Sequence, residues 1–155
     1  MPIKPTRLLF VCTGNTCRSQ MAHAIATEMV KHMDKSVDII SRGVLANPGT
    51  PTTADALTVL AEQGIEWLGT SRQLEADDVN WADHVWVMTQ EHLRCVQPLA
   101  FTTHGECLQK IELLLDESEI LDPLGLGIEA YQALYIELFE LLPKRLATLP
   151  SPSLA

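Results

Sequence analysis

Long apolar runs, aromatic side chains and basic residues are all scarce in this 155-residue chain. No stretch reaches the roughly 18 apolar residues of a transmembrane helix, so we expect no membrane anchor. Acidic residues outnumber basic ones, and the net charge of −9 argues against nucleic acid and anionic membranes as partners. Residues 1–5 lead into an apolar segment without a signal-peptide pattern, which favours a cytoplasmic location.

Cysteine is also sparse. The chain contains Cys12, Cys17, Cys95 and Cys107. Their spacing matches neither a metal site nor a small disulfide framework. We expect no bound metal and interpret Cys95 and Cys107 as buried thiols. A hydrophobic content of 46% over 155 residues is enough for one domain with a core. The expected domain spans residues 1–155, with a loose Pro- and Ser-rich tail at 149–155.

A strand, a short loop and a helix follow one another near the N-terminus. Arg7–Val11 is apolar enough for a buried parallel strand, and residues from about 19 to 33 have apolar side chains at helical spacing. The loop between them contains Gly14 and Asn15, which tolerate positive φ. Such a loop turns backbone N–H groups toward an anion, and the helix dipole adds positive charge. The segment is therefore predicted to bind inorganic phosphate or a similar oxyanion.

Two side chains at the ends of this loop could act on a bound anion. Arg18 can hold two oxygens of a tetrahedral oxyanion at once. Cys12 lies at the base of the loop, where positive surroundings should let the thiol ionise near or below neutral pH. The Ser19 hydroxyl could hydrogen-bond and stabilise the thiolate, which would attack a bound phosphoryl group. The Cys–Arg spacing alone is a weak signal, because a single cysteine is usually just a buried residue.

The complete string Cys12–Ser19, CTGNTCRS, is far more specific. It resembles the signature loop of the low-molecular-weight protein tyrosine phosphatases, and the resemblance extends over nearly the whole chain, including Ser71–Leu74. The resemblance implies a cysteine nucleophile at Cys12 and no metal or organic cofactor. The residues it implies as phosphate ligands are Thr13, Gly14, Asn15, Thr16, Cys17 and Arg18.

The rest of the chain alternates between strand and helix patterns. Further strands are expected at 37–41, 84–88 and 111–115. One helix should begin with Thr50 as its N-cap and Pro51 at its first position, and end at Gly64. A short helix should follow Thr89, and a last helix should start near Ile128. Pro143 should kink or end that last helix.

This alternation predicts a single α/β domain with helices on both faces of a parallel sheet. Ligands of such sheets bind beyond the carboxyl ends of the strands, which is where Cys12 falls. The resemblance implies, in addition, that the sheet has four strands and that the phosphate-binding loop follows the first of them.

Displacement at phosphorus also requires a proton donor for the leaving group. Asp122–Pro123 lies in an irregular segment before the last helix and resembles the family's aspartate–proline general acid. The implied mechanism passes through a thiophosphoryl group on Cys12, and Asp122 as carboxylate then activates water. By itself, an Asp-Pro pair in a loop is far more often a turn.

Four features depart from the family pattern, the last three of them from its tyrosine-specific members. Gln20 stands where a proline usually follows the serine, which should relax the first helical turn. Leu124–Gly125 stands in place of aromatic residues, Thr16 in place of a bulkier aliphatic residue, and Met88–Thr89 in place of methionine–aspartate. The last three features resemble the protein arginine phosphatases of the same family. We therefore favour phosphorylated proteins bearing phosphoarginine as substrates, with phosphotyrosine as the alternative.

Two other functions stay open. An arsenate reductase would use the same loop but needs further cysteines, and Cys95 and Cys107 are twelve positions apart. A non-catalytic phosphate-binding module would not require Cys12, Arg18 and Asp122 together.

The second cysteine of the loop suggests a redox role. Cys17 shares the curled loop with Cys12, so a reversible disulfide between them under peroxide is predicted. Cys17 as a simple filler of the loop is an equally good interpretation.

Overall fold

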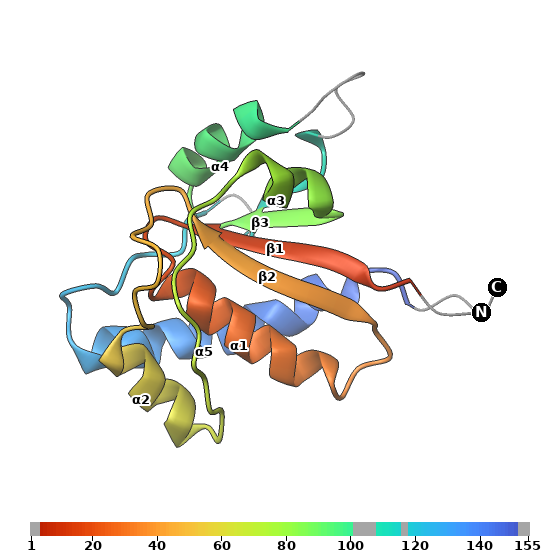
Figure 1. Cartoon of the computed structure of the whole chain (residues 1–155). Helices are drawn as coiled ribbons and strands as arrows, with labels where there is room; N and C mark the ends of the chain where they lie inside the picture. The colour runs from red at the N-terminus through yellow and green to blue at the C-terminus, as the bar shows by residue number, and fades with distance from the viewer. Residues whose placement is uncertain (1–3, 101–107, 116–117, 152–155) are drawn as a thin grey trace.

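The computed structural model describes residues 4–100, 108–115 and 118–151. Within these ranges a parallel sheet carries helices on both faces (Figure 1). The strands are β1 (Thr6–Cys12), β2 (Val37–Gly43), β3 (His84–Val87) and β4 (Ile111–Leu113). The helices are α1 (Arg18–Val30), α2 (Ala54–Glu62), α3 (Ala76–Trp81), α4 (Gln90–Val96) and α5 (Ile128–Ala147), with a 3-10 turn η1 at Gln97–Leu99.

The strands pair in parallel in the order β2-β1-β3-β4, which confirms the expected four-stranded sheet. β1 lies between β2 and β3. After β1 the chain forms β2 on one side of it and then β3 on the other side. Such a switch point opens a crevice beyond the carboxyl ends of the strands. Cys12 is the last residue of β1, so the loop after it begins in that crevice.

Side chains of β1 alternate between two apolar layers. Helices α1, α2 and α5 lie on one face of the sheet, and α3 and α4 lie on the other (Figure 1). Leu8 and Phe10 pack with the first group, whereas Leu9 and Val11 pack with the second. All four side chains are fully buried, and burying each contributes roughly 1.5–3 kcal/mol. This two-sided burial explains the uninterrupted apolar run and fixes the position of the loop that follows.

The second helix begins later than expected. Thr53, not Thr50, is the N-cap of α2, and its side chain makes no capping hydrogen bond. Pro51 instead forms an antiparallel bridge with Thr70, and Thr52 Oγ1 donates to the Gly69 carbonyl at 2.8 Å. Pairing with this distant segment keeps residues 50–52 extended, which the local cap pattern could not indicate.

Three further differences concern element ends. The short helix α3 was not predicted, although Glu75 and Asp78 form a capping box at its start. Pro143 does not end α5, which continues to Ala147. Leu149, the first residue of the expected loose tail, is 2% exposed and packs in the core, and Lys35 Nζ donates to its carbonyl. Residues 152–155 of that tail lie outside the described residues.

Other boundaries agree with the sequence patterns. Thr89 caps α4, and its hydroxyl accepts a hydrogen bond from the His92 amide at 3.2 Å. Gly64 follows the end of α2 with a φ of +78, the left-handed conformation that ends many helices.

Candidate active site

The loop between β1 and α1 is held tightly against the end of β2. Val44 and Leu45 donate backbone hydrogen bonds, each of 2.9 Å, to the carbonyls of Cys12 and Thr13. A Cβ on Gly43 would lie 2.5 Å from the Thr13 carbonyl oxygen, so only glycine permits this approach. Asn15 takes the left-handed conformation with φ of +57. Gly14 does not adopt a positive φ, so only one of the two loop residues that tolerate this conformation uses it.

Asn15 and Ser19 order the thiol of Cys12. Ser19 Oγ lies 2.8 Å from Cys12 Sγ, and the Asn15 amide donates to the same sulfur at 3.3 Å. Asn15 Nδ2 donates to Ser19 Oγ at 2.7 Å, which leaves the Ser19 proton available to the sulfur. Asn15 Oδ1 in turn accepts from the Arg72 amide at 2.9 Å. The Ser71–Leu74 stretch therefore supports the loop from behind.

Burial sets the ionisation of Cys12. Removal from water raises the pKa of this thiol, which is 2% exposed, and outweighs the effects that lower it. Those lowering effects are hydrogen bonds from Ser19 and Asn15 and the charge of Arg18. The direction of this shift is opposite to the lowering of the pKa that the sequence predicted. The sequence indicated the stabilising groups but not the depth at which the sulfur lies.

Arg18 joins the loop to the segment before α5. Its Nη1 donates to the Ile120 carbonyl at 3.0 Å, and its Nη2 donates to Thr13 Oγ1 at 3.2 Å. Nη2 also lies 3.7 Å from Asp122 Oδ2. Asp122 Oδ1 accepts the Leu124 amide at 3.1 Å, which orients the carboxylate at the rim. The fold thus brings Asp122 to the arginine of a loop about one hundred residues earlier.

Sequence reasoning missed His92. Its Nε2 lies 2.8 Å from Thr13 Oγ1, the same hydroxyl that Arg18 contacts. The ring is 2% exposed, and burial together with Arg18 lowers the pKa of His92 to about 4. His92 is therefore neutral near pH 7 and positions Thr13 without adding charge. No sequence motif marked it, although Thr89 identified the helix that carries it.

Gln20 tightens the loop rather than relaxing it. The Gln20 side chain is buried, and its Nε2 donates to the carbonyls of Asn15 and Thr70, each at 3.1 Å. Its Oε1 accepts from Trp67 Nε1 at 2.8 Å. The expectation of a looser first turn is wrong, because the side chain replaces the rigidity of a proline with three hydrogen bonds.

The loop encloses a cavity of about 120 Å³. Its lining consists of Cys12, Thr13, Gly14, Asn15, Thr16, Cys17, Arg18, Asp122 and Leu124. All the residues predicted to bind phosphate therefore line one cavity, together with the predicted acid. Ser19 lies behind this wall against the sulfur.

Cys17 and Cys95 differ in their surroundings. Cys17 Sγ lies 3.3 Å from the Tyr131 hydroxyl and 3.7 Å from Thr53 Oγ1, and the residue is buried. Cys95 is exposed, so its interpretation as a buried thiol is wrong, and Cys107 lies outside the described residues. Within the described ranges, no three His, Cys, Asp or Glu side chains gather where they could hold a metal ion. No helix there is both long and apolar enough for a membrane span.

The site combines a buried thiol with an arginine in an anion-binding loop, beyond the end of a central parallel strand. This combination is typical of proteins in which a cysteine reacts with a phosphoryl group. Comparison with known families identifies which of them this is. The model of the family described as low molecular weight phosphotyrosine protein phosphatase matches residues 7–152. The chain belongs to this family and is a cysteine-dependent protein phosphatase.

Relatives carry two kinds of name. The chain is 38% identical to the protein-arginine-phosphatase of Geobacillus stearothermophilus over 148 residues, 92% of this chain and 95% of that protein. It is 31% identical over 138 residues to the low molecular weight protein-tyrosine-phosphatase PtpB of Staphylococcus haemolyticus (strain JCSC1435), 89% of this chain and 96% of that protein.

Solved structures agree with this assignment. A YwlE arginine phosphatase mutant with a phosphorylated active-site serine superposes with a TM-score of 0.83 at 31% identity. The match covers 92% of this chain and 97% of that one.

Proposed function

We propose that this phosphatase hydrolyses phosphoarginine in proteins. The observation that carries the proposal is the wall of the cavity, where Thr16 and Leu124 stand beside Asp122 and no described lining residue is aromatic. A phosphotyrosine ring would gain little from such a wall, whereas a planar, polar guanidinium can hydrogen-bond to a hydroxyl and pair with a carboxylate. The name of the Geobacillus relative, a protein-arginine-phosphatase, supports the same choice.

In the proposed reaction, Cys12 attacks as the thiolate. The loop N–H groups and Arg18 hold the phosphoryl oxygens while the sulfur forms a bond to phosphorus. Ser19, whose hydroxyl lies 2.8 Å from the sulfur, stabilises the thiolate. The electrons of the breaking P–N bond pass to the arginine nitrogen.

Asp122 completes the proposed cycle. As a carboxylic acid it donates its proton to the leaving nitrogen, which restores the arginine guanidinium. As a carboxylate it then removes a proton from water, which attacks phosphorus and breaks the S–P bond. The products are inorganic phosphate and the free thiolate, and the scheme uses no metal or organic cofactor. The position of Asp122 at the cavity rim, 3.7 Å from Arg18, supports this role.

The alternatives differ in what they require. A phosphotyrosine phosphatase would use the same residues, and the PtpB name of the Staphylococcus relative keeps it as the second candidate. An arsenate reductase would require a resolving pair of thiols. Among the described cysteines outside the loop, Cys95 is exposed on α4 and is not one of the residues that line the cavity. A purely phosphate-binding module would not need an aspartate at the rim.

The experiment compares kcat/KM on phosphoarginine and phosphotyrosine peptides of otherwise identical sequence. Wild type should prefer phosphoarginine, and Thr16→Ile should shift the ratio toward phosphotyrosine by about 1–3 kcal/mol. Thr58→Ile, an exposed position on α2, makes the same change away from the cavity and should leave the ratio unchanged. A wild-type preference for phosphotyrosine would replace this proposal with the tyrosine phosphatase function.

We propose a redox role for Cys17 as well. Peroxide would convert Cys12 to the sulfenic acid, and the Cys17 thiol would displace water from it to form a disulfide. Cys17 must first leave its contact with Tyr131, 3.3 Å away. After peroxide treatment, wild type should regain activity with added thiol more fully than Cys17→Ser; equal recovery would leave Cys17 as a filler of the loop.

The setting of the enzyme is also a proposal. We propose one phosphatase domain over residues 1–155 that acts on phosphorylated proteins in the cytoplasm, without nucleic acid or membrane partners. The net charge of −9 and the family match over residues 7–152 support this view.

A further inference from the structure

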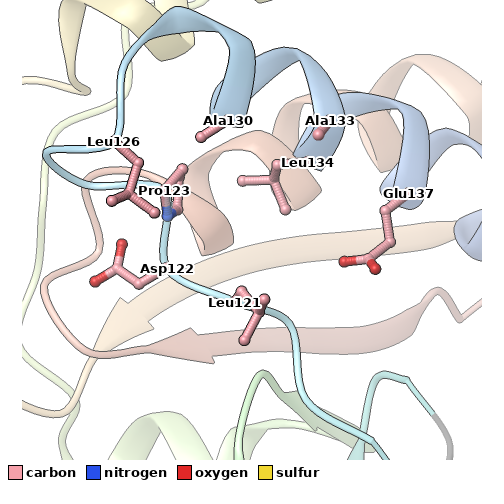
Figure 2. A pocket seen from close by; sticks show the side chains of 8 residues that line it. All are labelled: Leu121, Asp122, Pro123, Leu126, Ala130, Ala133, Leu134 and Glu137. Carbon is pink, nitrogen blue, oxygen red and sulfur yellow. The ribbon is translucent and has the colours of Figure 1, made fainter.

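A second cavity lies beside the active site, on the other side of Asp122. It has a volume of about 200 Å³ and separates the segment 121–126 from the first half of α5 (Figure 2). Its lining consists of Leu121, Asp122, Pro123, Leu126, Ala130, Ala133, Leu134 and Glu137. Asp122 lines both cavities, so the second cavity adjoins the place where the phosphorylated side chain would lie.

The walls of this cavity are apolar, with a carboxylate at each end. Leu121 and Leu126 are 79% and 68% exposed. Asp122 lies near one end, and Glu137 lies toward the other end along α5 (Figure 2). Burial raises the pKa of Glu137.

We propose that this cavity is a docking groove for the substrate protein, which places an aliphatic side chain between Leu121 and Leu126 and a basic side chain against Glu137. The proposal rests on the proposed function only in requiring a phosphorylated protein as substrate. The groove recognises residues next to the phosphorylated one and not the phosphorylated side chain itself.

Size favours a peptide side chain over a free small molecule. Pockets for small molecules usually measure about 300–1,000 Å³, and this cavity of about 200 Å³ is smaller. In an extended peptide, every second side chain lies on the same face, roughly 6–7 Å apart. A residue two positions from the phosphorylated one would therefore reach the groove while the phosphoryl group occupies the cavity around Cys12.

Charge favours a basic residue farther along the same peptide. From Ala130 to Glu137 the helix rises roughly 10 Å, about three residues of extended chain. The protein has a net charge of −9, and the groove itself contributes two carboxylates and no basic side chain among its lining residues. A lysine or arginine beyond the aliphatic residue would meet Glu137.

The test uses peptides with leucine or aspartate two positions from the phosphorylated residue. Wild type should hydrolyse the leucine peptides about tenfold more efficiently in kcat/KM. Ala133→Leu fills the groove with a good helix former, so it should abolish this preference. Gln132→Leu, the neighbouring exposed residue outside the lining, should keep it. All three proteins should hydrolyse para-nitrophenyl phosphate equally, because that substrate has no flanking residue.

A second comparison tests Glu137. Peptides with lysine beyond the leucine should be preferred about two- to fivefold over those with norleucine there, and Glu137→Gln should remove the preference. Glu140→Gln, an exposed position on the same helix outside the lining, is the matched control. Loss of the lysine preference in both variants would overturn a specific contact with Glu137.

Each peptide is made with phosphoarginine and with phosphotyrosine at its centre. The ratio between the two centres tests the proposed function, and the leucine-to-aspartate ratio tests the groove. A wild-type preference for the phosphotyrosine centre, together with a leucine preference, would refute the phosphoarginine proposal and support the groove. Equal hydrolysis of leucine and aspartate peptides by wild type, or a leucine preference that survives Ala133→Leu, would overturn the groove proposal.

Discussion

Gln20 Nε2 lies 3.1 Å from the carbonyl oxygen of Asn15, so a side chain in the first turn of α1 holds the loop that precedes it. The same nitrogen reaches the Thr70 carbonyl, and Trp67 fixes the other end of the amide. Gly69 makes this arrangement possible, since a Cβ there would lie 2.1 Å from Gln20 Oε1. Two chain segments, 15–20 and 67–70, thus meet at one buried amide, and we expect the shape of the phosphate-binding loop to depend on it.

Gln20→Glu tests this contact with a side chain of nearly the same shape. The change replaces the donor with an acceptor that faces two carbonyl oxygens, so the free energy of unfolding should fall by about 1–3 kcal/mol. Because Asn15 moves, KM and the dissociation constant for inorganic phosphate should rise more than kcat falls. Gln132→Glu, exposed on α5, provides the control. Unchanged phosphate affinity in a folded Gln20→Glu protein would show that the amide only supports the fold.

His92 is expected to act through Thr13. His92→Gln should lower kcat/KM about two- to tenfold, since the change disturbs a hydrogen bond to the hydroxyl that also orients Arg18. His32→Gln, an exposed histidine near the end of α1, should have no effect. Thr13→Ala should reduce the further loss caused by His92→Gln, because the two residues share one contact. Additive losses in the double variant would argue against this coupling.

Ser19→Ala should change the pH dependence of the thiol. The Ser19 hydrogen bonds lower the pKa of Cys12, so their removal should raise it further. Alkylation by iodoacetamide requires the thiolate, and its rate therefore rises with pH through the pKa of the thiol. The midpoint of that rise should move to higher pH in Ser19→Ala, whereas Ser118→Ala, far along the chain, should leave it in place. A shift to lower pH would contradict the proposed role of Ser19.

Asp122→Asn should slow substrates according to their leaving groups. Without an acid, kcat on phenyl phosphate should fall about 100-fold or more, because the phenolate leaves with difficulty unless it is protonated. The loss on para-nitrophenyl phosphate should be much smaller, since that leaving group has a low pKa. Asp34→Asn, at an exposed position, is the control. Equal losses on both substrates would remove Asp122 as the general acid.

The sequence predicted the sheet and the phosphate-binding loop because both depend on local patterns. Leu8–Val11 had to be apolar for burial on two faces, and CTGNTCRS is specific as a string. The sequence could not indicate contacts made by distant segments. Because residues 50–52 pair with 69–71, α2 begins later than its local pattern predicts. The burial of Cys12 reverses the expected direction of its pKa shift.

Gln20 and His92 show the same difficulty at the site. From the sequence, Gln20 was interpreted only as a residue that replaces a proline, because its partners Trp67 and Thr70 lie about fifty residues away along the chain. The sequence did not single out His92, because nothing in its own segment identifies Thr13 as a neighbour. Asp122 could be selected only through its resemblance to a family motif, and the fold supplies its proximity to Arg18.

The covalent step at Cys12 is the central claim, and trapping the intermediate tests it most directly. Asp122→Asn protein is mixed with a phosphoarginine peptide and stopped by acid within milliseconds, and the digested chain is analysed by mass spectrometry. One phosphoryl group should appear on Cys12 in this variant. The same result is expected when Cys95 is also changed to serine. No phosphoryl group should appear under these brief conditions when Cys12→Ser is combined with Asp122→Asn. Phosphate on another residue, or full turnover by Cys12→Ser, would contradict a cysteine-based mechanism.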